Sequence, residues 1–494
     1  MVTYLMMLLI LGLSTDCTKD DIKVLKEKLY MGGQYYVATW GDDMNPGTYE
    51  EPWGTWQKAF NTAEPGDTVY FRGGIWYRQQ DDPVPRINVR SGIGNSGTVN
   101  NPIRFFAYPP DIENGDSVIY DVINHLPGGE APQEGWNVGI SVSWADYLHF
   151  KGLTVKNVWQ GRPFIHCVGI GIIGCTNIIL ENMTVYNIGG RGIYYDPRHD
   201  NSESYFINID TYNCYNTYPV NQYQYDRGRT GTDGKGLFIV NVDQEGFESY
   251  VEVRGCRAWN CSDDGWNIVS SGLTLVENSW TFLNGVGDSE QTPGSGGNGY
   301  KVNISNQRQY YDDPGQVNHK VFNVISAFNA DTGFTENRNG RHSINRQMYN
   351  NIAYKNVTGF AIQGNHPEDW EMRNNEYINN IGYANDYRDL GEYRGGYAYT
   401  NLTNSWNDHP GVTVSDADFT NINDEDIIAQ LKAPRKPDGS LPDLTVFRLS
   451  ENSKLKGAGT NVGMSQNPDI GIDWKYLDEK QGNSITNLMN RLSN

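Results

Sequence analysis

The chain has 494 residues and a formal net charge of −20, with 59 Asp and Glu against 39 Lys and Arg. Binding to nucleic acid relies on clustered Lys and Arg, so a chain this acidic argues against a nucleic-acid partner. Glycine is abundant at 55 residues and aromatic residues make up 12%, a composition that favours many short strands joined by tight turns and therefore an all-β fold.

The N-terminal residues are predicted to direct export. Residues 4–13 form an apolar run that is too short to span a bilayer and is typical of a signal peptide. The following Cys17-Thr18-Lys19-Asp20-Asp21 resembles the start of a bacterial lipoprotein, although Ser14-Thr15-Asp16 departs from the usual small residues before such a cysteine. We predict a lipoprotein signal peptide over 1–17 with lipidation at Cys17, and a tether over 18–34. The expected location is the bacterial outer membrane or cell surface, or the periplasm, with the lipid as the only membrane contact.

The folded part is predicted to begin near residue 35 with a capping helix. Thr55 can cap a short helix whose Trp56, Ala59, Phe60 and Ala63 fall on one face. A turn at 65–67 then leads into a strand over 68–71. A helix that precedes the first strand can cover the open end of a β-helix, where a bare strand edge would invite aggregation.

Beyond this helix the sequence repeats with a period in the twenties. Short segments end in an aromatic residue followed directly, or one residue later, by Asn. These asparagines are Asn187, Asn213, Asn260, Asn284, Asn329 and Asn356. Such a period is a solenoid signature, in which stacked coils supply the core that a single coil cannot. We expect the asparagines to stack as a ladder at one turn.

A second repeat fixes which side chains point outward. Five segments begin with glycine and a bulky apolar residue, at Gly236, Gly265, Gly299, Gly333 and Gly359. Side chains alternate along a strand, so an inward bulky residue leaves an outward column of Phe238, Asn267, Lys301, Thr335 and Ala361. The predicted fold is a right-handed parallel β-helix, a solenoid, over residues 35–415. Residues 416–494 are expected to form a C-terminal cap or trailing segment with one helix in 423–436.

The cysteines do not predict a metal site. The six residues, Cys17, Cys167, Cys175, Cys214, Cys256 and Cys261, include no zinc-like CxxC pair, and only 8 histidines are present. Buried free thiols are favoured over disulfides for Cys167, Cys175, Cys214 and Cys256, because they fall in strand-like patterns.

Carboxylates and a lysine converge on the outward face. Asp233 precedes the Gly236 strand, and Asp263 and Asp264 precede the next one. Three carboxylates at one end of adjacent strands suit a calcium ion, although aspartates are also common in solvated turns. Lys301 follows one coil later and is either a surface lysine or a Brønsted base. Burial and a nearby cation would lower its pKa and favour the neutral amine.

The order of these motifs carries a family resemblance. Residues 232–236 (TDGKG), 256–267 (CRAWNCSDDGWN) and 297–301 (GNGYK), with the entry at 35–38 and 65–70, are similar to polysaccharide lyase family 9 over residues 35–385. The resemblance implies a parallel β-helix, a calcium site made by aspartates, a lysine base and pectic substrates.

Carried onto this chain, the resemblance assigns calcium ligation to Asp233, Asp263 and Asp264, and the base to Lys301. The family pattern usually has Asp where this chain has Asn267, whose carbonyl can still ligate calcium but lacks the charge. The implied reaction is β-elimination: calcium neutralises the uronate carboxylate, Lys301 removes the C5 proton, and the O4 bond breaks.

Substrate contacts and alternative functions remain open. Arg338 and Arg341 follow the next coil and either bind further carboxylates or are ordinary loop residues. We expect a monomeric lyase acting on an acidic pectic polysaccharide, with rhamnogalacturonan I slightly favoured over homogalacturonan. The alternatives are a β-helix glycoside hydrolase, which would use paired carboxylates, and a non-catalytic surface protein that binds glycans.

Overall fold

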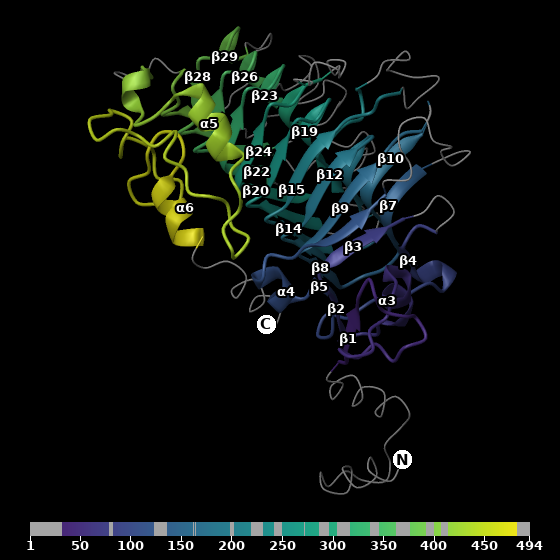
Figure 1. Ribbon diagram of the computed structural model, residues 1–494. Helices are drawn as coiled ribbons and strands as arrows, with labels where there is room; N and C mark the ends of the chain where they lie inside the picture. Colours follow the sequence, from purple (N-terminus) through teal and green to yellow (C-terminus); the bar gives the residue numbers. More distant parts are fainter. Residues whose placement is uncertain are drawn as a thin grey trace, which may run out of the picture.

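The computed structural model describes residues 32–78, 83–122, 136–161, 163, 165–197, 202–218, 231–241, 249–270, 272–285, 296–303, 317–335, 345–361, 376–391, 400–406 and 413–481. The chain winds around one axis as a parallel β-helix, and each coil pairs with the next along three faces (Figure 1). The all-β parallel β-helix predicted from the sequence is confirmed.

The first face is a ten-stranded parallel sheet, which carries the candidate site. Its strands are β4 (Arg86–Asn88), β7 (Trp136–Ser143), β10 (His166–Ile173), β13 (Arg191–Asp196), β16 (Leu237–Asn241), β19 (Asp264–Ser270), β21 (Asn298–Asn303), β23 (Thr332–Thr335), β26 (Thr358–Ala361) and β29 (Arg388–Leu390).

The second and third faces share their longest strands, β20 and β22, which run through both faces. The second face contains β1 (Gln34–Val37), β2 (Thr68–Phe71), β5 (Ile103–Ala107), β8 (Leu148–Lys151), β11 (Ile178–Glu181), β14 (Ser202–Ile207), β17 (Ser249–Arg254), β20 (Leu273–Phe282), β22 (Val317–Ala327), β24 (Asn345–Tyr349), β27 (Glu376–Ile378) and β30 (Thr400–Leu402). The third face adds β3 (Gly74–Tyr77), β6 (Val118–Asp121), β9 (Leu153–Val158), β12 (Thr184–Ile188), β15 (Asp210–Cys214), β18 (Arg257–Trp259), β25 (Ile352–Tyr354) and β28 (Ile381–Tyr383).

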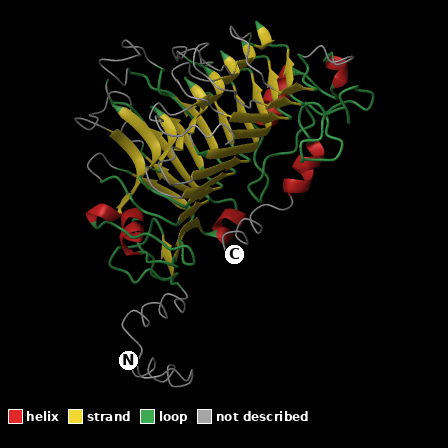
Figure 2. Ribbon diagram, turned by 180° about the vertical axis from the view of Figure 1, so that it is seen from behind, coloured by secondary structure: helices red, strands yellow, loops and turns green. Residues whose placement is uncertain are grey.

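The described helices are short and lie outside the stack of strands (Figure 2). They are α3 (Trp56–Thr62), α4 (Pro109–Glu113), α5 (Asp424–Leu431) and α6 (Trp474–Gln481), with 3₁₀ turns at Val89–Ser91 and Asp416–Asp418. The predicted capping helix is α3: the Thr55 hydroxyl accepts a hydrogen bond from the Lys58 backbone N–H at 3.1 Å. Its Trp56 and Phe60 are buried against the aromatic residues of the first coils.

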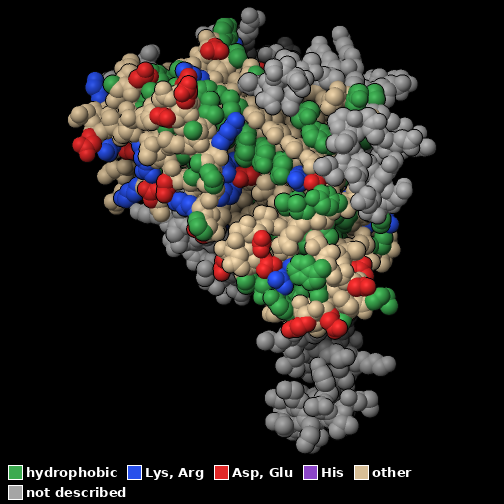
Figure 3. Space-filling view, in the orientation of Figure 1, with side chains coloured by type: hydrophobic (Ala, Val, Ile, Leu, Met, Phe, Trp, Pro, Cys, Tyr) green, Lys and Arg blue, Asp and Glu red, His purple; other side chains and the backbone are tan. Residues whose placement is uncertain are grey.

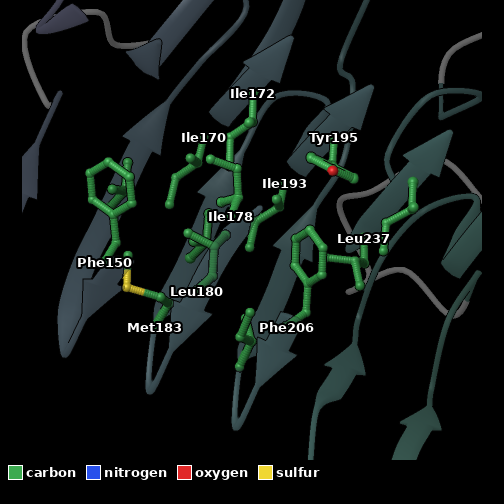
Figure 4. Packing of buried hydrophobic residues seen from close by; sticks show 14 of the residues in the cluster. Phe150, Ile170, Ile172, Ile178, Leu180, Met183, Ile193, Tyr195, Phe206 and Leu237 are labelled. Atoms are coloured by element: carbon green, nitrogen blue, oxygen red, sulfur yellow. The ribbon is translucent and has the colours of Figure 1, made fainter. Parts of the chain in front are cut away.

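The interior is filled by aliphatic and aromatic side chains from all three faces. In Figure 4, Ile170, Ile172 and Ile193 of the first face point toward Leu180 and Phe206 of the second. All five are buried. Because adjacent coils place like residues in register, the core continues along the axis, as the repeat predicted.

Asparagines stack in ladders, but in more than one. An outer ladder joins Asn157, Asn187, Asn213 and Asn260 through amide hydrogen bonds of 3.1–3.3 Å. An inner ladder joins Asn284, Asn329, Asn356 and Asn385. The expectation of one ladder was therefore wrong. Trp259 pairs with Phe282, and Phe282 with Ala327, so Asn284 and Asn329 stand one position beyond Asn260.

The C-terminal segment lies along the flank of the solenoid (Figure 1). Its helix α5 falls within the range predicted from the sequence, and apolar residues of the segment pack against the third face. Arg257 and Arg435 both pair with Asp210 at 2.6 Å, and the Arg257 guanidinium also donates to the carbonyls of Leu431 and Ala433. The segment thus covers a lateral face of several coils.

Two further findings concern the helices and the cysteines of the described residues. No helix in the described ranges is long and apolar enough to cross a membrane. Cys167, Cys175, Cys214 and Cys256 are buried and free, which confirms the prediction of buried thiols, and Cys261 is also buried and free.

Candidate functional site

The candidate site lies where β16, β19 and β21 run side by side. Leu237 pairs with Trp266 and Trp266 with Tyr300, and all three are buried. Their neighbours on the opposite side of the strands, Asn267 and Lys301, also pair directly. The outward column predicted from the glycine motifs is confirmed, and Trp266 and Tyr300 belong to the core.

A glycine lies at or next to the first residue of each of these strands, because neighbouring groups approach too closely for a side chain. A Cβ on Gly265 would stand 1.9 Å from the Thr281 hydroxyl, and one on Gly299 would stand 2.0 Å from the Ser326 hydroxyl. Both contacts are far below van der Waals distance. The glycines therefore fix the register that aligns Asn267 with Lys301.

Lys301 is held by a buried carboxylate. Its Nζ donates to Asp264 Oδ2 at 2.8 Å and lies 4.0 Å from Asp263 Oδ1. The amide groups of Asn267 and Asn298 also donate to Asp264, at 3.2 and 2.9 Å. Asp264 is fully buried, so these three hydrogen bonds satisfy a carboxylate that has no access to water.

Asp233 and Asp263 are joined by a lysine. Lys235 Nζ lies 2.5 Å from Asp263 Oδ2 and 3.3 Å from Asp233 Oδ1. Asp233 also pairs with Arg191 at 2.9 Å and with His166 at 3.2 Å. The sequence argument brought the three aspartates together correctly, but it assigned no role to Lys235, Arg191 or His166.

A shared sequence position could have revealed two of these residues. Arg191 and Lys235 immediately precede Gly192 and Gly236, as Asp264 precedes Gly265. Extending the glycine register one coil toward the N-terminus would have placed both cations in the column of Asp264. His166 carries no such signal, because it lies on β10 and its partner is 67 residues away.

Burial and charge shift the pKa values of the site in different directions. Burial, and then the charge of Asp264, raise the pKa of Asp263 despite the opposing lysines. Burial would also raise the pKa of Asp233, but Arg191 and Lys235 outweigh it and the pKa falls below its usual range. Asp263 is therefore protonated more readily than Asp233.

The expected pKa shift of Lys301 is corrected. Burial does lower the pKa of this amine, but the charges of Asp264 and Asp263 outweigh burial and the pKa is raised above its ordinary value. The sequence argument counted burial and a cation, and it left out the two carboxylates that contact the amine.

The arrangement does not fit a calcium ion as it stands. Calcium takes six to eight oxygen ligands, whereas Asp264 is fully engaged and Lys235 occupies the space between Asp233 and Asp263. Asn267 turns its amide group toward Asp264. Across the described ranges, no three side chains of His, Cys, Asp or Glu are grouped to hold a metal.

Three predicted residues lie outside the described residues. Arg338 and Arg341 belong to 336–344, and Cys17 belongs to 1–31. Substrate binding by the two arginines and lipidation of Cys17 stay predictions.

Comparison with known proteins supports the same family as the motifs. A family model described as "Pel9A-like, right handed beta helix region" matches residues 35–386. The chain belongs to this family. The match spans all the strands of the candidate site and confirms the right-handed β-helix and the resemblance to polysaccharide lyase family 9.

Relatives of this Pel9A-like chain include bacterial and fungal proteins. It is 26% identical to pectate lyase L of Dickeya chrysanthemi, over 93% of each chain. It is also 26% identical to pectate lyase PEL9 of Emericella nidulans, over 62% of this chain and 70% of that protein.

Two solved structures share the fold of this family member. Pectate lyase Pel9A has a TM-score of 0.65 at 23% identity and covers 90% of this chain and 97% of its own. A rhamnogalacturonan lyase has a TM-score of 0.60 at 22% identity, over 85% of this chain and 97% of its own.

Proposed function

We propose that the protein is a polysaccharide lyase that cleaves galacturonate-containing pectic polysaccharide by β-elimination, with Lys301 as the base. The observation that carries this proposal is the position of Lys301, which lies in the outward column with its amine beside Asp264 and its side chain 11% exposed. The family match and the relatives named pectate lyase support the reaction class.

The reaction requires one proton transfer at this column. The neutral amine of Lys301 takes the proton from C5 of a galacturonate residue. The electron pair left at C5 forms the C4–C5 double bond as the C4–O4 bond breaks. The departing oxygen then takes a proton from water, and the hydroxide formed takes the proton from Lys301, which restores the neutral amine. Each cut therefore leaves one unsaturated chain end and consumes no net water.

The role of Asp264 follows from its contacts. This carboxylate orients Lys301 and, in contact with its Nζ at 2.8 Å, stabilises the ammonium form, which cannot accept the C5 proton. Turnover should therefore depend on the fraction of Lys301 that is neutral, which increases with pH.

Calcium assistance, which the sequence predicts, is left out of this proposal, because Lys235 lies between Asp233 and Asp263. The choice among pectic polymers remains a prediction from the sequence. Arg338 and Arg341 are proposed to bind neighbouring uronates. Rhamnogalacturonan I stays slightly favoured, and the similarity to solved structures named pectate lyase and rhamnogalacturonan lyase extends only to the fold.

The test is a panel of purified polymers. Homogalacturonan and rhamnogalacturonan I are incubated with the protein, and a neutral galactan serves as the control. The ultraviolet absorbance of the conjugated double bond should rise with at least one galacturonate polymer and not with galactan. Chain shortening without that absorbance would contradict the proposal.

We also propose that lipidation of Cys17 anchors the exported protein, on the resemblance of residues 17–21 to a lipoprotein start. The variant Cys17→Ala should move from the membrane fraction to the soluble fraction when expressed in a bacterium with lipoprotein processing. An unchanged membrane fraction would rule out Cys17 as the anchor.

A further inference from the structure

The cation that joins the aspartates is part of the chain itself. We infer that the ammonium group of Lys235 takes the place between Asp233 and Asp263 that calcium was expected to fill. The cluster then binds no calcium while Lys235 keeps its charge. This inference concerns the site of the proposed function, but it makes a statement about metal binding that needs no substrate to test.

The contacts of Lys235 resemble those of a bound ion. Its Nζ donates to Asp263, Asp233 and the backbone carbonyl of Thr232, at 2.5, 3.3 and 3.2 Å. These three oxygens come from two neighbouring coils, so the amine links the coils as a bridging cation would. The side chain is only 8% exposed, which leaves little room for an ion with its own water shell.

The charges of the cluster already balance. Three carboxylates, Asp233, Asp263 and Asp264, face three basic side chains, Arg191, Lys235 and Lys301. A divalent ion added here would gain attraction from the carboxylates but would be repelled by all three cations in a buried setting. His166, the further partner of Asp233, would add to that repulsion when protonated.

Two sequence features act in the same direction. Asn267 stands where the family pattern usually has Asp, so one negative charge is missing from the strand of Asp264. Lys235 immediately precedes Gly236, as Asp264 precedes Gly265, and Leu237 pairs with Trp266. The lysine therefore lies one coil from Asp264 in the same column. Each feature weakens calcium binding, because the charge of the ligand set tunes calcium affinity.

Removing only the charge of Lys235 tests the inference. Lys235→Met keeps most of the side-chain volume and leaves Asp233 and Asp263 without their shared cation. Calcium binding is measured by titration calorimetry and by the calcium-dependent shift of the melting temperature, on chelator-treated full-length protein. We expect no detectable calcium binding by the wild type. Lys235→Met should bind calcium with an affinity at least on the order of 100-fold above the detection limit of the wild-type titration.

Lys156→Met is the matched control, because Lys156 also pairs with a buried aspartate, Asp121, but on another face. This variant should not gain calcium binding. One calcium ion bound tightly by the wild type, and lost in Asp263→Asn, would overturn the inference. That wild-type measurement decides the question even if Lys235→Met fails to fold. A wild type that forms no unsaturated product with or without calcium would contradict the proposed function and leave the calorimetry unaffected.

Discussion

At the scale of single residues, Lys301 combines access and charge. Lys301 is the lysine of the outward column, and its amine contacts the Asp264 carboxylate at 2.8 Å. A lysine base must be neutral to act, and the raised pKa of Lys301 means that neutral amine is scarce at pH 7. The structure therefore links the proposed chemistry to alkaline conditions.

Lys301→Ala should reduce turnover on a galacturonate polymer by a factor on the order of 10²–10⁴, the usual contribution of a positioned base. Lys301→Arg should lose nearly as much, because arginine keeps its proton. The wild-type rate should still be rising with pH as the ordinary lysine pKa of about 10.4 is approached, since the pKa of Lys301 is raised.

Initial rates across pH, together with polymer binding by each variant, provide the check. Binding should survive both substitutions. Near-normal turnover of correctly folded Lys301→Ala would remove this residue from the mechanism.

The residue scale also shows what sequence can and cannot provide. The glycine motifs placed Asn267, Lys301 and the buried aromatic residues correctly. Side chains alternate along a strand, so assigning one residue to the core assigns its neighbour to the outer side. The pKa of Lys301 was predicted in the wrong direction. Its sign depends on distances to two carboxylates on another coil, and spacing along the chain does not give those distances.

At the scale of elements, the asparagine ladders hold neighbouring coils in register. Asn329 in the inner ladder is buried and accepts hydrogen bonds from the backbone and side chain of Asn284, at 3.1 and 2.8 Å. It also donates to Asn356 at 2.8 Å. Asn260 in the outer ladder is half-buried and makes a longer bond of 3.3 Å to Asn213.

Asn329→Ala should lower the free energy of unfolding by roughly 3 kcal/mol, because it leaves buried polar groups of the neighbouring residues without a hydrogen-bond partner. Asn260→Gly is the matched variant: it removes an outer rung, and glycine tolerates the positive φ of 53° at that position. It should cost less than about 1 kcal/mol. Denaturant unfolding of both variants checks the difference, and equal losses would contradict the distinction between the ladders.

The misassignment of the ladders has a physical cause. Two consecutive turn positions both accept asparagine. The first needs a left-handed backbone conformation, as at Asn260, and the second needs a buried side chain that makes amide hydrogen bonds, as at Asn329. Position 283 also has a positive φ of 56°, although it is leucine. Residue type alone therefore did not separate the two positions, and the strand pairing was needed.

At the scale of the whole molecule, the strongly acidic chain meets its proposed acidic substrate at a cluster whose charges balance. On the face drawn in Figure 3, Lys and Arg side chains lie among Asp and Glu side chains rather than in a patch of one sign.

The solenoid was predictable from its repeat, whereas the course of the C-terminal segment was not. Its helix α5 was expected, but the segment is joined to the coils by contacts such as Arg435 with Asp210, 225 residues apart. No local sequence pattern predicts a contact between residues so far apart in the chain.

The central claim is that the protein breaks its substrate by elimination, and the origin of the oxygen at the new chain ends tests it most directly. Digestion of a galacturonate polymer in heavy-oxygen water, followed by mass spectrometry, distinguishes elimination from hydrolysis. We predict unsaturated products that carry no solvent oxygen, because C4–O4 cleavage leaves the original oxygen on the departing fragment. Saturated products with one heavy oxygen per cut would show a hydrolase and contradict the account.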